Sequence, residues 1–367
     1  MKLVINREKL LEPLQLACGV VERRQTSPIL SNLLLQTEDG IVVIVGTDQE
    51  VEVTVELQDV AVSEGGEVTV PGRKLLDICR SLPDAADLTL NLEGNRVAVD
   101  SGRFSSHLST LPAEDFPFID FGDAQTTISL GRDDLARLLQ RTTFAMAQQD
   151  VRYFFNGVLL EVEEGQVRFV ATNGQRLATS SVALDGAEGK HQYIIPRKAV
   201  GELSRIIADG REATVSLEFT GNHMRVMLGH ITLITKLIDA TYPDYTRAIP
   251  VGGDKVVTAD RRVLKEALTR TAILSNELYR NVRLLLSEGK LDMHANNPQQ
   301  EEAEESITID YAGPELEIGF NVSYLIEALS VMEGDIVRLT LSDPGSACLI
   351  EDPDESESLF VISPMVL

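Results

Sequence analysis

Half of the basic residues of this 367-residue chain lie in six short segments whose apolar residues recur with helical spacing. The segments contain 17 of the 33 Lys and Arg but only 9 of the 57 Asp and Glu, in a chain with a formal charge of −24. They are residues 7–24, 73–82, 132–142, 197–207, 261–270 and 322–332. Basic side chains on neighbouring helices can contact nucleic-acid phosphates without reading bases. The distribution favours a phosphate-facing helical surface, uneven because the last segment has no basic residue, over the alternative of solvated helix faces.

Residue patterns typical of enzymes and metal sites are missing from the sequence. The three cysteines form no spaced pair, the five histidines are scattered, and there is no phosphate loop or nucleophile elbow. We therefore expect a non-catalytic protein with no cofactor and no metal, and reject the alternative of a catalytic cleft formed by DVRYFFNG and ATNGQR. The chain has no signal-peptide pattern and no apolar run long enough to span a membrane, which predicts a cytoplasmic protein with buried, reduced cysteines and no membrane partner.

Three hairpin-like runs recur at the spacing of a whole domain. Each has two apolar stretches flanking a glycine, as expected for two strands and a turn. The runs are NLLLQTEDGIVVIVGTD from Asn32, NGVLLEVEEGQVRFVATN from Asn156 and NVRLLLSEGKLDMHANN from Asn281. The turn glycines are Gly40, Gly165 and Gly289. A repeat of this length indicates three domains of like fold in a row.

Two amphipathic helices recur with the hairpins. One helix follows a strand-like run, and its three copies are RKLLDICRSL, RKAVGELSRII and VSYLIEALSVM. The other helix precedes the hairpin, and its three copies are NREKLLEPLQ, GRDDLARLLQ and DRRVLKEALT. Pro13 inside the first copy should distort that helix. Two short helices cannot cover both faces of a many-stranded sheet, so we predict α+β domains with helices on one face and an antiparallel sheet on the other. The expected domains are residues 1–124, 125–252 and 253–367.

Long motifs in the same order over the whole chain resemble the β sliding clamp, the β subunit of bacterial DNA polymerase III. They include SPILSNLLL (27–35), VPGRKLLDICRSLP (70–83), FAMAQQDVRYFFNG (144–157) and ANNPQQEEAEE (295–305). The resemblance implies a DNA clamp fold and a ring-shaped, head-to-tail homodimer, with helices lining a central hole and sheets outside. It implies a processivity factor that encircles duplex DNA and holds the polymerase there by topology. A protein-binding scaffold without DNA is the alternative that the helical charge disfavours.

The resemblance assigns two sets of binding residues. Sequence-independent DNA contacts fall on Arg24, Arg73, Arg80, Gln149, Tyr153, Arg197 and Lys198. A hydrophobic pocket would take short apolar peptide motifs of the replicative polymerase α subunit, the clamp loader, other polymerases and repair proteins. Its residues are Phe155, Thr172, Gly174, Gln175, Arg176, Leu177, Pro243, Arg247, Ala248, Tyr279, Asn321, Tyr324, Val361, Ile362, Ser363, Pro364, Met365, Val366 and Leu367.

The resemblance also implies a dimer interface, and the chain departs from the family in both contact regions. The interface residues are Arg96, Arg103, Ser106 and Leu108 on one side and Ile273, Leu274, Glu301, Glu302, Glu304 and Glu305 on the other. Members usually carry an aromatic residue at Ser106, a histidine at Gln175, a methionine at Ser363 and an arginine at Val366. These departures suggest a divergent or secondary clamp with altered affinity for clients or inhibitors.

Overall fold

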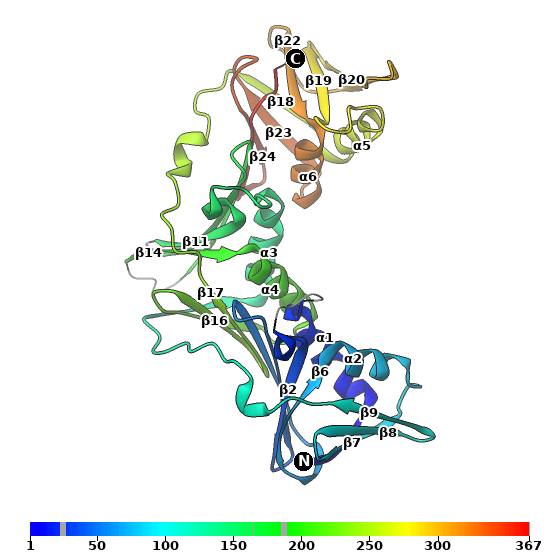
Figure 1. Cartoon of the computed structure of the whole chain (residues 1–367). Helices are drawn as coiled ribbons and strands as arrows, with labels where there is room; N and C mark the ends of the chain where they lie inside the picture. Colours follow the sequence, from blue (N-terminus) through cyan, green and yellow to red (C-terminus); the bar gives the residue numbers. More distant parts are fainter. Residues whose placement is uncertain (23–26, 164, 185–188, 367) are drawn as a thin grey trace. The chain divides into compact units, whose positions relative to one another are not determined.

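The computed structural model describes residues 1–22, 27–163, 165–184 and 189–366 (Figure 1). The chain forms two compact units, Met1–Leu135 with Lys198–Leu237 and Ala136–Arg197 with Ile238–Leu367. Each unit contains one eight-stranded antiparallel sheet and one smaller antiparallel sheet. The units are described separately below.

The first unit contains a five-stranded and an eight-stranded sheet. In spatial order, the five strands are β5 (Ala61–Glu64), β1 (Lys2–Asn6), β7 (Asp87–Glu93), β8 (Arg96–Ser101) and β9 (Phe104–Ser109). The eight strands are β10 (Thr126–Gly131), β15 (Thr214–Phe219), β16 (His223–Leu228), β17 (Ile231–Lys236), β4 (Val51–Leu57), β3 (Ile41–Thr47), β2 (Asn32–Glu38) and β6 (Gly66–Pro71).

The second unit contains an eight-stranded and a four-stranded sheet. In spatial order, the eight strands are β14 (Lys190–Pro196), β11 (Gly157–Glu163), β12 (Gln166–Thr172), β13 (Arg176–Ala183), β25 (Glu355–Ile362), β24 (Cys348–Asp352), β23 (Ile336–Leu341) and β18 (Lys255–Asp260). The four strands are β21 (Glu302–Thr308), β20 (Lys290–Asn296), β19 (Asn281–Ser287) and β22 (Leu316–Asn321).

The helices lie where the sequence predicts them. They are α1 (Arg7–Val20), α2 (Gly72–Ser81), α3 (Arg132–Thr142), α4 (Arg197–Asp209), α5 (Arg261–Ala272) and α6 (Val322–Val331). Short 3-10 helices are η1 (Pro28–Ser31), η2 (Ala113–Asp115), η3 (Thr143–Ala145), η4 (Tyr153–Asn156) and η5 (Tyr245–Ala248). Helix α1 packs on α2 and on strands β3 and β4, while α5 packs on α6 and on β20 and β21. Helix α1 continues through the buried Pro13 as one element, so the proline does not end it.

The structure confirms the three hairpins and their turn glycines. Strand pairs β2–β3, β11–β12 and β19–β20 are antiparallel neighbours. Gly40, Gly165 and Gly289 have φ values of 83°, 79° and 69°. Glycine adopts this left-handed conformation without the steric cost of a Cβ atom, which explains its recurrence in each copy. The fold is the predicted α+β architecture of antiparallel sheets and paired helices (Figure 1).

Each eight-stranded sheet continues from one repeat into the next, through one strand pair that we call an intrachain junction. The junctions pair β4 with β17 and β13 with β25. Val53 lies opposite Leu233 in the first, and Ala178 lies opposite Phe360 in the second. All four side chains are essentially buried, so both junctions are apolar at their centres.

Cross-strand register shows that the two junctions use equivalent positions. In each repeat a row of directly opposed residues crosses four strands. The row begins four residues before the first residue of the repeat's first helix. The rows are Ile128, Leu217, Val226 and Leu233; Val257, Leu339, Ile350 and Phe360; and Leu3, Leu90, Val99 and Ser106. The third row ends in a serine on β9, where the other two end in large apolar side chains.

A repeated arginine joins the paired helices of each repeat. Arg7, at the start of α1, donates through Nε to the carbonyl of Cys79 in the last turn of α2 at 3.0 Å. Arg132, at the start of α3, likewise donates to the carbonyl that follows α4. Arg261, at the start of α5, donates through Nη1 to the carbonyl of Leu329 in α6 at 3.0 Å. Carbonyls at a helix C-terminus lack intrahelical donors and favour a nearby cation, so these arginines act as caps.

Candidate functional site

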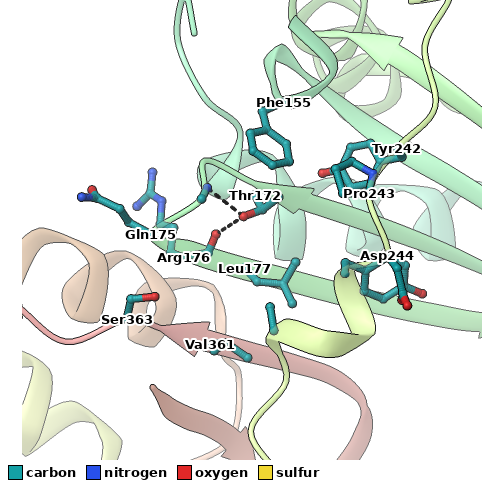
Figure 2. Close-up of a pocket in the computed structure, with 13 residues that line it drawn as sticks. Phe155, Thr172, Gln175, Arg176, Leu177, Tyr242, Pro243, Asp244, Val361 and Ser363 are labelled. Atoms are coloured by element: carbon teal, nitrogen blue, oxygen red, sulfur yellow. Dashed lines mark hydrogen bonds between the residues drawn. The ribbon is translucent and has the colours of Figure 1, made fainter. Parts of the chain in front are cut away.

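A small, largely apolar cavity of about 160 Å³ lies in the second unit (Figure 2). The apolar cluster beneath it includes Phe155, Leu177, Tyr242 and Val361, all at most 8% exposed. The lining residues are Phe155, Thr172, Gly174, Gln175, Arg176, Leu177, Tyr242, Pro243, Asp244, Tyr245, Ala248, Val361 and Ser363. A concave apolar surface with polar groups at its rim suits a short peptide carrying apolar side chains.

The turn between β12 and β13 forms the polar rim of the cavity. Thr172 Oγ1 accepts a hydrogen bond from the Gly174 amide at 3.0 Å and donates one to the Arg176 carbonyl at 2.6 Å (Figure 2). Asn173 Oδ1 accepts from the amides of Gln175 and Arg176 at 2.9 and 3.0 Å. Gly174 has a φ of 88°. These side-chain bonds replace the strand ladder at the turn and give the rim a fixed shape.

Arg176 is held in place by three neighbours. Its guanidinium lies 4.3 Å from the ring centroid of Tyr324 and 5.2 Å from that of Phe144, both suitable for cation–π attraction. The same guanidinium pairs with Glu327, and its side chain is only 10% exposed. Tyr324 also donates its hydroxyl to Gln175 Oε1 at 3.1 Å. Arg176 is thus a preorganised cation beside the apolar cavity.

A second arginine borders the rim. The Arg152 guanidinium lies 4.8 Å from the ring centroid of Phe155 and donates to the carbonyl of Asn173 at 3.2 Å. It also pairs with Asp150 at 2.8 Å, and this hydrogen bond lowers the pKa of the Asp150 carboxyl to about 2. A carboxylate fixed in this way remains ionised at physiological pH.

The opposite wall of the cavity is formed by residues 238–249, which include the predicted pocket residues Pro243 and Ala248. Its residues Tyr242, Asp244 and Tyr245 line the cavity and were not predicted. Tyr242 is 6% exposed, and burial raises the pKa of its hydroxyl. The run TYPDY has no strand or helix period, so only its density of aromatic residues could have signalled packing.

Eight of the predicted pocket residues that the structure describes do not line the cavity. The side chain of Arg247 is 85% exposed and pairs with Asp244 at 3.0 Å, and Tyr279 and Val366 are 63% and 101% exposed. Asn321 caps α6 by accepting from the Ser323 amide at 3.0 Å. The others are Tyr324, Ile362, Pro364 and Met365. The predicted pocket residue Leu367 is outside the described residues.

Three of the predicted DNA-contacting cations make internal contacts. Arg73 donates to the carbonyl of Val21 at 2.6 Å, and Arg197 donates to the carbonyl of Ala147 at 3.3 Å. Lys198 pairs with Glu22 at 2.9 Å and also with Asp48. Burial lowers the pKa of Lys198, but hydrogen bonds to these two carboxylates outweigh it and leave the pKa raised.

The other predicted DNA residues differ in how accessible they are. Arg80 is exposed on α2, and Tyr153 is 55% exposed in η4. Gln149 has a φ of 55°, a conformation uncommon outside glycine. Arg24 is outside the described residues. Lys74 on α2 and Arg262 on α5 are also exposed and form no ion pair with another described residue, which makes them candidates that the sequence assignment missed.

Strands β9 and β21 each end a sheet and carry five of the predicted interface residues, Ser106, Leu108, Glu302, Glu304 and Glu305. Leu108 on β9 is 7% exposed, whereas Ile273 after α5 is 74% exposed. Ser106 Oγ is buried and has no hydrogen-bond partner among the described residues. Arg270 donates through Nε to Glu305 at 3.0 Å, and this bond lowers the pKa of the Glu305 carboxyl. Of the other predicted interface residues, Arg96 begins β8, Arg103 directly precedes β9, Leu274 follows α5 and Glu301 directly precedes β21.

The described ranges of the chain contain neither a candidate metal site nor a membrane-spanning helix. No three His, Cys, Asp or Glu side chains there gather in a way that could hold a metal ion. No helix there is both long and apolar enough to cross a membrane.

The repeated α+β units, together with the apolar pocket and its polar rim, are those of the class of DNA clamps. Models of the N-terminal, central and C-terminal domains of the DNA polymerase III beta subunit match residues 1–120, 129–244 and 246–366. The chain belongs to the bacterial β sliding clamp family. It is a processivity factor of DNA polymerase III and a non-catalytic polymerase subunit.

Relatives and solved structures match over the full length of the chain. The beta sliding clamps of Pseudomonas putida and Escherichia coli K12 are 50% and 44% identical, each with 100% of both chains covered. The sliding clamps of Pseudomonas aeruginosa and Bartonella birtlesii, each bound to griselimycin, have TM-scores of 0.96 and 0.97 at 48% and 35% identity, again covering 100% of both chains.

Proposed function

We propose that two copies of the chain close head to tail into a ring around duplex DNA. The supporting observation is the repeated intrachain junction. Strand β4 of the first repeat pairs with β17 of the second, and β13 of the second repeat pairs with β25 of the third. The equivalent strands are β21 in the third repeat and β9 in the first, and each ends its sheet without such a partner in the described chain. We call the pairing of β9 with β21 of a second copy the closing junction. A heterologous contact of this kind closes a ring when its rotation matches the internal ones.

The internal register supplies the register of the closing junction. Val53, Ala178 and Ala303 are 125 residues apart, and their partners Leu233 and Phe360 are equivalent to Ser106. Ala303 should therefore lie opposite Ser106. This places Arg96 near Glu301 of the other copy and Arg103 near Glu305. Opposite charges at the two ends of the strand pair would set its direction and register.

Such a ring would hold DNA by topology more than by affinity. Several of its helix cations are occupied by internal carbonyls and carboxylates, as Arg73, Arg197 and Lys198 show, and the chain is strongly acidic overall. The remaining phosphate contacts would be few and screened by salt. We expect weak binding to short linear duplex and a shallow dependence of affinity on salt.

Retention on circular DNA tests the ring. The protein would be loaded by a compatible clamp loader onto nicked circular plasmid and gel-filtered in high salt, with half of each sample linearised beforehand. We expect retention on circles and loss after linearisation. Equal retention on linear DNA would mean ordinary affinity and would refute the topological mechanism.

For the pocket, we propose that it binds short apolar peptide motifs of client proteins. The clients would be the polymerase α subunit, the clamp loader, and other polymerases and repair proteins. Support comes from the apolar floor of Phe155, Leu177 and Val361 and from the preorganised cation Arg176 beside it. A peptide with adjacent apolar side chains and one acidic or amide group would match both features.

Two of the departures from the family, Gln175 and Ser363, lie at the rim of this pocket, which supports a specialised clamp with altered client or inhibitor affinity. Gln175 accepts from Tyr324, and the Ser363 amide donates to the Gln175 carbonyl at 2.8 Å, so both are part of the rim structure. Titrating a client peptide against the wild type and the variant Gln175→His, Ser363→Met, Val366→Arg measures their effect. Indistinguishable affinities would contradict a specialised role.

A further inference from the structure

Tyr245 links the irregular pocket wall to the sheet behind it. Its ring lines the cavity, and its hydroxyl donates to Glu161 Oε2 on β11 at 2.8 Å. The same hydroxyl accepts from Arg168 Nη1 on β12 at 3.1 Å. One side chain of the wall is therefore bonded to two neighbouring strands.

Glu161 is the centre of this linkage. It is 3% exposed, and its cross-strand neighbours are Arg168 on β12 and Gln192 on β14. Gln192 Nε2 donates to Glu161 Oε1 at 2.8 Å, and Lys190 Nζ lies 3.7 Å from the same oxygen. A carboxylate this inaccessible is costly unless hydrogen bonds and opposite charges compensate it. Both oxygens of Glu161 are accordingly satisfied.

The protonation state of Glu161 agrees with this geometry. Burial raises the pKa of its carboxyl, but hydrogen bonds from Gln192 and Tyr245 and the nearby Lys190 and Arg168 lower it by more. The carboxyl is consequently ionised at neutral pH. An ionised acceptor forms stronger hydrogen bonds than a neutral one, which strengthens the bond to Tyr245.

Apolar packing also attaches the wall, because Ile238, Ala240 and Ile249 pack against the buried cluster around Phe155. The Ile238 amide donates to the Ile194 carbonyl on β14 at 2.9 Å, at the start of the segment. Further along, Tyr242 packs edge-on against Phe155, with ring centroids 5.9 Å apart. Beyond it, η5 carries the lining residue Ala248 and begins at Tyr245. Among the described residues, the Tyr245 hydroxyl makes the side-chain hydrogen bonds that join η5 to the strands of the sheet.

We propose that Glu161, with Arg168, is a positioning residue for the peptide pocket: it holds Tyr245 and the η5 wall at the distance that an apolar peptide requires. The proposal rests on the peptide-binding role proposed above. Neither residue lines the cavity, so their effect on binding would act through Tyr245.

Binding of griselimycin to the full-length protein tests this proposal. Isothermal titration calorimetry would compare the wild type with Glu161→Gln and Tyr245→Phe. Glu161→Gln makes the acceptor of the Tyr245 hydroxyl neutral, and Tyr245→Phe removes that hydroxyl, while the side-chain volume stays nearly constant in both. Because ligand contacts restore part of the wall, we expect Kd to rise about fivefold to tenfold, less than the full value of such a bond. The double variant should bind no more weakly than the weaker single variant.

Glu163→Gln is the matched control. Glu163 lies on the same strand and pairs with Lys190 at 3.2 Å, but forms no hydrogen bond to the wall among the described residues. Its affinity for griselimycin should equal that of the wild type. A similar loss in Glu163→Gln, or wild-type affinity in Glu161→Gln and Tyr245→Phe, would overturn the proposal.

Hydrogen exchange without ligand separates this inference from the pocket's proposed function. Amides of residues 245–249 should exchange faster in Glu161→Gln and Tyr245→Phe than in the wild type or Glu163→Gln. If the wild type fails to bind griselimycin but the exchange difference appears, the binding role is wrong and the positioning of the wall stands. Unchanged exchange in both variants would refute the positioning role whatever the affinities.

Discussion

Substituting Ser106 by phenylalanine should stabilise the dimer, because the closing junction lacks the apolar centre of its two internal counterparts. At the equivalent position Phe360 is 1% exposed and lies opposite Ala178, whose other neighbour across the sheet is Ala171. In the proposed register Ser106 lies opposite Ala303, whose neighbour is Ala295. The two alanine environments match, so a phenylalanine at position 106 has a precedent within the same chain.

The magnitude follows from the area that the new side chain removes from water. Burying a phenylalanine contributes about 1.5–3 kcal/mol. A ring contains two copies of the closing junction, which gives about 3–6 kcal/mol for the dimer. Since about 1.4 kcal/mol is a tenfold change, the dimer Kd should fall on the order of 100-fold or more. The substitution also removes a buried hydroxyl that has no partner among the described residues.

Sedimentation and subunit-exchange measurements would test this expectation. The dimer Kd would come from analytical ultracentrifugation, and the exchange rate from energy transfer between labelled subunits. Ser105→Phe is the matched control because Ser105 is exposed on the opposite face of β9. An unchanged Kd in Ser106→Phe, or an equal gain in Ser105→Phe, would refute the register and the packing argument together.

Further predictions concern protonation and helix capping. Burial raises the pKa of the Cys18 and Cys348 thiols to about 12, so neither should react with a thiol reagent at pH 8 until the protein is unfolded. Burial also raises the pKa of the Glu52 carboxyl, so the folded protein binds this proton more tightly than the unfolded chain does. The folded state therefore loses stability as the pH rises from the pKa of Glu52 in the unfolded chain to its pKa in the folded protein. Glu52→Gln should therefore raise the melting temperature at pH 8, with the gain disappearing towards pH 4 in a thermal-melt series. Arg261→Ala should lower the free energy of unfolding by about 1–2 kcal/mol in urea titrations because it uncaps α6, whereas Arg262→Ala should leave it nearly unchanged.

The local elements could be predicted from the sequence because each has a short-range signature. The apolar stripes of the six segments and the glycines at 40, 165 and 289 identify the helices and the hairpins. Continuity of the sheets between repeats leaves no such signature. Strands β4 and β17 meet through Val53 and Leu233, which are far apart in the sequence, and alternation within each strand says nothing about its partner.

The sites could be predicted only in part, for two physical reasons. Charge counting treats every lysine and arginine alike, yet Arg7, Arg132 and Arg261 are committed to helix carbonyls, which periodicity does not reveal. The pocket wall has no regular structure, so nothing in the spacing of Tyr242 and Tyr245 indicates that they fold back onto the sheet. The structure is needed to separate cations that face solvent from those used internally.

The continuous sheets also determine how the chain can be divided. Val51, Val53 and Val55 of β4 are at most 1% exposed, and β17 of the following repeat supplies the partner along that strand. Cutting the chain near residue 124 would remove β17 and leave an apolar strand with a free row of amide and carbonyl groups. Exposed edges of this kind recruit other strands and promote aggregation. A single repeat expressed alone would therefore be poorly soluble, although its own elements are all present.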